Sequence, residues 1–232
     1  MTGREPRKPR EAPVDLSLQT HRRIIGTLGL MLPILIYLFA GARPTQGLVP
    51  WRLLGSVSAY YYTGGVGVFV GVLFALSLFL FSYRGYEGVK ADRIVGTVGG
   101  AAALVVALFP TGAPVQSLQL WWWAPPTGII HYVAAIVLFG AFILFSVWLF
   151  RRSDTRRRRD RPATKRGRDD VCLACGLVMI GAVLWAAVAG VTGGPIFLPE
   201  AIAIVAFAVS WLVKGEAHVP VIRATKRLAK RP

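Results

Sequence analysis

The chain has 232 residues, 54% of which are hydrophobic, and it carries a formal net charge of +16. Three long stretches, residues 53–83, 94–150 and 171–199, contain no Asp, Glu, Lys or Arg. A helix of a soluble protein needs a polar outer face, so these stretches exclude a soluble globular fold. The basic residues flank the apolar stretches, which indicates a membrane topology and no nucleic-acid partner.

The apolar pattern predicts an all-α fold, a polytopic membrane bundle of six helices. Because about 20 apolar residues cross a bilayer, we expect these helices at about 24–41, 56–83, 94–110, 127–150, 171–190 and 195–213. The bundle then covers residues 24–214, between basic tails at 1–23 and 215–232. The first tail has too few apolar residues to fold, and the second would suit a short helix on the membrane surface. The first helix also resembles a secretory signal, but its apolar region is too long for one.

The second expected helix has a polar beginning. Residues 56–63 are rich in Ser and Tyr, and the apolar part runs from Val66 to Tyr83. Tyrosine favours the boundary between lipid and water, so we place residues 56–63 at interfacial depth. Gly67 and Gly71, like Gly96 and Gly100 on the next helix, are four residues apart. This spacing favours close helix packing, either within the chain or between two copies of it.

The distribution of Lys and Arg predicts the orientation. Of the 27 Lys and Arg residues, only Arg43 and Arg52 fall on one side of the expected helices. The positive-inside rule therefore predicts cytoplasmic termini and a cytoplasmic arginine-rich loop in the inner or plasma membrane of a cell. Cys172 and Cys175 lie at a cytoplasmic helix entrance, so we expect free thiols.

Two ionisable residues, His131 and Glu200, fall inside the expected membrane helices. The N-terminal ends of the second, fourth and sixth helices share the external face, where they form a polar cluster. The members of this candidate site are Tyr60, Tyr61, Tyr62, Thr63, His131 and Glu200. Glu200 either offsets the dipole of its helix or binds a proton or cation with a neighbouring imidazole or phenol.

No metal, cofactor or catalytic motif is expected. The other histidines, His21 and His218, belong to the cytoplasmic side, about 30 Å from His131. Cys172 and Cys175 lack the second ligand pair of a structural zinc site. The serines of the second, fourth and sixth helices have no base or GxSxG setting beside them, so the chain is not expected to be an enzyme.

Basic residues where helices leave the membrane are candidate contacts for lipid headgroups. They are Arg84, Arg151, Arg152 and Lys214. Anionic headgroups attract such residues by about 1 kcal/mol each. The same charges could instead serve only to fix the topology.

Several short motifs are similar to those of an uncharacterised bacterial family of six-helix membrane proteins. They are Ser58-Ala59-Tyr60-Tyr61-Tyr62-Thr63, Val68-Phe69-Val70-Gly71, Tyr83-Arg84-Gly85-Tyr86, Ala107-Leu108-Phe109-Pro110-Thr111 and Ser210-Trp211-Leu212-Val213-Lys214-Gly215-Glu216. The resemblance covers residues 55–216 and implies a six-helix fold without implying an activity. Members of the family carry an Arg-Asp pair where this chain has Val66-Gly67.

These observations favour a binding function. We expect a lipid-binding or accessory membrane component, with membrane lipids, a second copy or a membrane complex as partner. The alternative is a small-solute or proton-coupled carrier that uses Glu200 and His131. An intramembrane lipid hydrolase of the alkaline-ceramidase kind is disfavoured, because its zinc chemistry needs several histidines on one face.

Overall fold

A computed structural model describes residues 17–41, 53–85, 90–115, 117–152 and 163–217. Its elements are α1 (Leu18–Ala40), η1 (Ser58–Tyr62), α2 (Val66–Phe81), α3 (Lys90–Leu108), α4 (Pro125–Val147), η2 (Leu149–Arg151), α5 (Ala163–Val191) and α6 (Phe197–Lys214), where η denotes a 3-10 helix. No strand occurs in this part of the chain. The predictions for residues 1–16 and 218–232, for Arg43 and Arg52, and for the middle of the arginine-rich loop concern parts of the chain outside the described residues.

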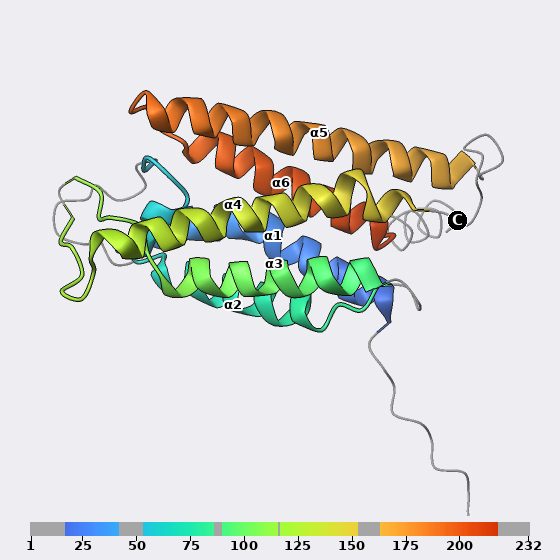
Figure 1. Ribbon diagram of the computed structural model, residues 1–232, viewed down its shortest axis with the longest axis horizontal. Helices are drawn as coiled ribbons and strands as arrows, with labels where there is room; N and C mark the ends of the chain where they lie inside the picture. Colours follow the sequence, from blue (N-terminus) through green and yellow to red (C-terminus); the bar gives the residue numbers. More distant parts are fainter. Residues whose placement is uncertain (1–16, 42–52, 86–89, 116, 153–162, 218–232) are drawn as a thin grey trace, which may run out of the picture.

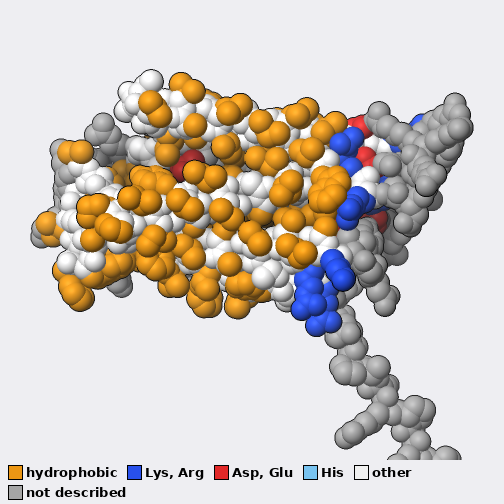
Figure 2. Space-filling model, in the orientation of Figure 1, with side chains coloured by type: hydrophobic (Ala, Val, Ile, Leu, Met, Phe, Trp, Pro, Cys, Tyr) orange, Lys and Arg blue, Asp and Glu red, His pale blue; other side chains and the backbone are white. Residues whose placement is uncertain are grey.

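The helices run up and down along one long axis (Figure 1). α1, α3 and α5 begin at the same end of the bundle at which α2, α4 and α6 finish. The Lys and Arg side chains visible in Figure 2 gather at this end, which we call the basic end; the opposite one is the far end. The described basic side chains of this end include Arg22, Arg84, Lys90, Arg152, Arg168 and Lys214.

Five of the described helices, all except α2, are long and apolar enough to cross a membrane. Between the two ends, the face drawn in Figure 2 is largely covered by hydrophobic side chains. Large apolar residues of the helices, such as Ile136, Leu184 and Val188, are exposed. An apolar surface of this extent is compatible with a multi-pass membrane protein.

The second helix is shorter than expected. Residues 56–65, placed in that helix by the sequence, instead contain the short 3-10 helix η1 between bends and turns, and α2 itself begins at Val66 and has 16 residues. At 1.5 Å per residue, α2 spans about 24 Å, less than the roughly 30 Å of a hydrocarbon core. The break follows from Gly64 and Gly65, which lie between η1 and α2 and are poor helix formers.

Three other helices begin four or more residues earlier than predicted, and one of them is α3, which starts at Lys90 and not at Ile94. α1 starts at Leu18, inside the segment expected to be an unfolded tail, and Ser17 caps it by accepting a hydrogen bond from the Thr20 amide. Two polar residues of its first turns, His21 and Arg22, are buried, and Arg22 donates through Nε and Nη2 to the Tyr83 hydroxyl, at 3.0 and 2.9 Å. α5 starts at Ala163 and not near Val171, so it carries part of the arginine-rich loop as helix.

Glycines set the closest helix contacts. A Cβ added to Gly29 of α1 would lie 2.8 Å from the ring of Phe207 on α6. On α3, a Cβ on Gly96 or Gly100 would meet backbone carbonyls of α2 at 2.9 and 3.0 Å, so this pair packs within the chain. Gly71, like Gly67, has nothing within 4 Å of such a Cβ and does not serve packing inside this chain.

An aromatic cluster fills the core near the basic end. The fully buried ring of Trp211 lies 5.1 Å from that of Tyr83 and 4.9 Å from those of Phe145 and Phe150, centroid to centroid. These rings belong to the ends of α2, α4 and α6, which the cluster joins. Edge-to-face pairs of this kind stabilise by about 0.5–1.5 kcal/mol beyond the area they bury.

Candidate functional site

A loop and a short 3-10 helix close the far end of the bundle over α6. The Gly55 carbonyl accepts hydrogen bonds from the amides of Ile196 and Phe197, at 2.6 and 2.9 Å. These amides begin α6, where the backbone donors of a helix have no partner inside the helix. Residues 53–62, which we call the cap segment, are therefore held to α6 by two backbone amides at the start of α6 that have no partner within the helix.

Glu200 strengthens the same attachment. It lies in the first turn of α6, and its Oε2 accepts a 2.7 Å hydrogen bond from the amide of Val57 in the cap segment. The sequence left open whether this carboxylate offsets the helix dipole or binds a proton or cation. Glu200 lies at the positive end of the α6 dipole and accepts a hydrogen bond from Val57, so it has a structural role under either interpretation.

His131 binds the next residue of the cap segment. Its Nδ1 lies 2.6 Å from the Phe109 carbonyl oxygen, and its Nε2 lies 2.9 Å from the Ser58 hydroxyl. A carbonyl oxygen only accepts, so Nδ1 carries the ring hydrogen. In the neutral imidazole Nε2 is then an acceptor, and Ser58 donates to it. His131 is 1% exposed, so this arrangement is shielded from the surroundings.

The tyrosines hold the cap segment from its other side. Tyr62 donates its hydroxyl to the Thr111 carbonyl at 2.5 Å, and the buried ring of Tyr60 lies 5.6 Å from that of Phe197. Thr63 donates to the Tyr60 carbonyl at 2.8 Å and ends the turn.

The six residues predicted as one polar cluster thus meet around the cap segment, but they do not form one connected group. Glu200 is hydrogen-bonded to Val57 and His131 to Ser58, so the two side chains bind adjacent residues of the cap segment. The sequence missed Ser58 as a partner of His131. The hydroxyl lies in the uncharged, tyrosine-rich run, but nothing local indicates which helix it faces.

A small cavity of about 50 Å³ lies behind the cap segment. Apart from Ser58 and Glu200 its walls are apolar or glycine, and they come from five helices and the cap segment: Gly29, Leu32, Val57, Phe69, Val72, Leu73, Leu76, Val106, Ala135, Leu138, Phe139, Phe142, Ile204 and Phe207. A space of this size is enough for a few water molecules. Ser58 and Glu200 therefore face a common interior space.

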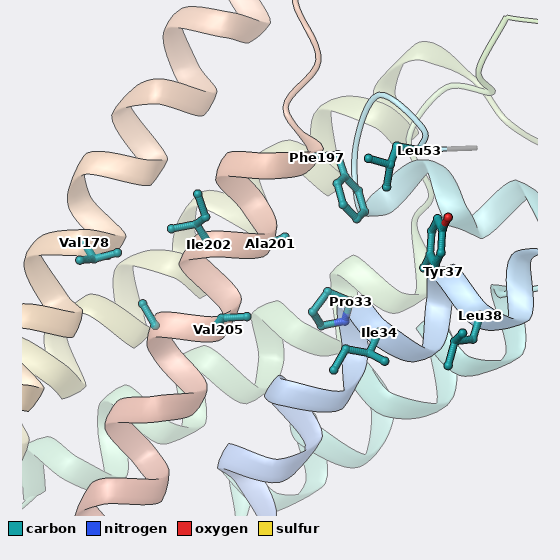
Figure 3. A pocket seen from close by; sticks show the side chains of 11 residues that line it. Pro33, Ile34, Tyr37, Leu38, Leu53, Val178, Phe197, Ala201, Ile202 and Val205 are labelled. Carbon is teal, nitrogen blue, oxygen red and sulfur yellow. The ribbon is translucent and has the colours of Figure 1, made fainter. Parts of the chain in front are cut away.

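A larger groove of about 800 Å³ opens on the outside of α1 and α6 (Figure 3). Its lining is apolar except for the Tyr37 hydroxyl: Pro33, Ile34, Tyr37, Leu38, Leu53, Val178, Phe197, Ala201, Ile202, Val205 and Ala206. α1 and α6 touch at Gly26 and Gly29, nearer the basic end, and the groove occupies the space between them toward the far end. We call it the α1–α6 groove.

The basic-end candidates have different surroundings. Arg84 is exposed, and the Arg152 guanidinium lies 4.2 Å above the Trp148 ring. Arg151 donates to the Val147 carbonyl at 3.1 Å, and Lys214 donates to the Phe150 carbonyl. Each of these carbonyls belongs to the end of α4 or to η2, so both side chains also cap a helix end.

No group of three or more His, Cys, Asp or Glu side chains in the described residues could hold a metal ion. Cys172 and Cys175 are buried free thiols, and Cys172 lies 3.8 Å from the Ser210 carbonyl oxygen. No protein-family model, curated protein or solved structure matches the chain.

Proposed function

We propose that this protein is a six-pass membrane protein that binds a lipid acyl chain in the α1–α6 groove, with both termini and the basic loops in the cytoplasm. The groove carries the proposal. Its volume, about 800 Å³, falls within the range of small-molecule sites, about 300–1,000 Å³. Its walls offer a ligand almost nothing but hydrocarbon contacts.

Connectivity supports the sixth crossing. α1 leaves the basic end and α3 begins there again, so α2 must return the chain across the membrane. The 16 residues of α2 and the five of η1 together supply the length that α2 alone lacks. The cytoplasmic assignment of the basic end follows from the positive-inside rule.

The chemistry of the groove favours a lipid over a polar solute. A polar solute would lose hydrogen bonds to water without finding partners, at a cost of about 1–3 kcal/mol for each group. An acyl chain loses no hydrogen bond when it enters the groove, and the Tyr37 hydroxyl can meet an ester oxygen at one edge of the groove. The helices beside the groove are apolar enough to lie in the hydrocarbon of a membrane. The lipids of that membrane supply the ligand.

At the basic end we propose that anionic headgroups bind Arg84, Arg151, Arg152 and Lys214. Arg84 and Arg152 are exposed, and Arg151 and Lys214 lie at the same end of the bundle, at the helix ends whose carbonyls they cap. A membrane partner protein or a second copy remains compatible with this arrangement as a further proposal.

Native mass spectrometry of the full chain released from mild detergent tests the groove. The Ala201→Trp variant fills the groove with an indole, and Ala101→Trp does the same in a shallower apolar hollow of about 470 Å³ between α3 and α4. We expect the wild type and Ala101→Trp to retain one lipid per chain, and Ala201→Trp to lose it. Equal lipid retention by all three proteins, or none by the wild type, would show that the groove has only bulk lipid around it.

A further inference from the structure

We propose that Ser58 is a nucleophile, activated by His131, that takes the acyl group of a lipid ester reaching it from the α1–α6 groove. The proposal rests on the lipid binding proposed above and names the chemistry of that site. The arrangement that carries it is the hydroxyl of Ser58, the imidazole of His131 and the carbonyl of Phe109 in one hydrogen-bonded line beside a cavity.

The line has the order that nucleophilic catalysis needs. A serine hydroxyl is a weak nucleophile until a base within about 2.6–3.2 Å can take its proton, and a third group must orient that base. Here Nε2 of His131 is 2.9 Å from the hydroxyl, and the Phe109 carbonyl fixes the hydrogen on Nδ1. Phe109 is thus a positioning residue, because it keeps Nε2 free to accept.

The surroundings distinguish this serine from the others of the core. Ser58 lines the small cavity, so open space lies beside it in the interior. By contrast, the hydroxyls of Ser146 and Ser210 lie 2.7 Å from each other, and both side chains are fully buried. That pair has no imidazole beside it in the hydrogen bonds described, which makes it an internal control.

The cavity and the groove are neighbours across one turn of α6 and one of α1. Glu200 lines the cavity and Ala201 the groove, and on α1 the same holds for Leu32 and Pro33. Phe197 lines the groove and packs against Tyr60, two residues from Ser58. Pro33 removes a backbone hydrogen bond from α1 at this level, and the proposal requires α1 to bend away from α6 here to admit an ester.

The reaction is an ester hydrolysis with water as the second reactant. Oγ of Ser58 forms a bond to the ester carbonyl carbon while its proton passes to Nε2 of His131. The bond from that carbon to the alcohol oxygen breaks, and Nε2 returns the proton to the leaving alcohol. Water then attacks the acyl-serine, gives its proton to Nε2, and releases a fatty acid as the proton returns to Oγ. No oxidation or reduction occurs.

Fluorophosphonate probes test the nucleophile in the purified full-length protein, with the modified residue located by peptide mass spectrometry. We expect a short-chain probe to modify Ser58 and leave Ser210 unmodified. Ser58→Ala should abolish the adduct, and His131→Gln should slow its formation by at least about 100-fold, the usual contribution of a general base. Gel filtration and the melting temperature identify a variant that fails to fold, and the mapped site in the wild type decides the question independently.

A long-chain fluorophosphonate then separates this inference from the lipid-binding function. We expect Ala201→Trp to slow modification by the long-chain probe only, while Ala101→Trp slows neither probe. If the short-chain probe modifies Ser58 but Ala201→Trp leaves the long-chain reaction unchanged, the nucleophile stands and the route through the groove is refuted. If neither probe modifies Ser58, or if His131→Gln reacts as fast as the wild type, the proposed nucleophile is refuted, whatever lipid the groove retains.

Discussion

The hydroxyl of Ser58 lies 2.9 Å from Nε2 of His131, although 73 positions separate the two residues in the chain. This hydrogen bond ties the cap segment to α4, as the bond between Glu200 and the Val57 amide ties it to α6. Two adjacent residues of one short segment thus join two membrane helices at the far end. The stability of that end depends on a few polar contacts in an apolar interior.

Substituting Glu200 will show how much its hydrogen bond contributes. Glu200→Leu removes the acceptor and leaves the Val57 amide unpaired, which should lower the free energy of unfolding by about 1–3 kcal/mol. Glu200→Gln keeps a side-chain oxygen in place and should retain most of the stability. Denaturant unfolding in detergent measures both variants; equal losses would mean that the negative charge, and not the hydrogen bond, is what α6 needs.

The contact between α1 and α6 can be tested with a single methyl group. Gly29→Ala places a Cβ 2.8 Å from the Phe207 ring, which is stacked on Phe142 at 3.6 Å and has little room to move. We expect a loss of about 1–3 kcal/mol, as for other overpacked cores. Gly71→Ala is the matched control, because its Cβ meets nothing within 4 Å. It should be neutral or stabilising by up to about 1 kcal/mol.

Removing the Tyr83 hydroxyl should destabilise the basic end. Tyr83→Phe deprives the buried Arg22 guanidinium of an acceptor for two of its nitrogens and keeps the ring beside Trp211. We expect a cost of about 1–3 kcal/mol, seen as a lower melting temperature. Tyr132→Phe, on an exposed ring, serves as control and should melt with the wild type. An unchanged melting temperature for Tyr83→Phe would mean that other partners satisfy Arg22.

Cysteine accessibility will test the orientation. Leu118→Cys places a thiol on a residue that is 80% exposed at the far end, and Thr164→Cys places one at the exposed start of α5. An impermeant maleimide added to intact cells should label Leu118→Cys only, and permeabilised cells should label both. The native cysteines are buried, so the wild type should remain unlabelled. Labelling of Thr164→Cys in intact cells would reverse the proposed topology.

Much of the helical architecture could be predicted from the sequence, because hydrocarbon thickness imposes a length on apolar segments. α4 and α6 fall within a few residues of their predicted bounds, since Pro125 and Pro195 mark their starts and charged residues follow their ends. The start of α1 was missed, because Arg22 looks like a residue of a soluble tail until Tyr83 is brought beside it.

The candidate site was harder to predict. His131 and Glu200 stand out in the sequence as ionisable residues in apolar surroundings, and both lie at the far end of their helices as expected. Their partners were not predictable, because one is the hydroxyl of Ser58 and the other is a backbone amide. A backbone amide leaves no trace in the residue types, and the pairing depends on how residues 56–65 turn. The prediction of an α-helix for residues 56–65 was wrong. An α-helix there would have pointed the Val57 amide and the Ser58 hydroxyl in other directions.

The pairing of α1 with α6 has a consequence for biogenesis. Arg23 of α1 donates to the carbonyls of Gly215 and Glu216, which the ribosome adds almost two hundred residues later. Through most of translation α1 must therefore stay in the lipid with one flank uncovered, available to chaperones or to neighbouring chains. The α1–α6 groove and the contacts of the cap segment with α6 form only when α6 inserts. A nascent chain that stalls before this point has neither.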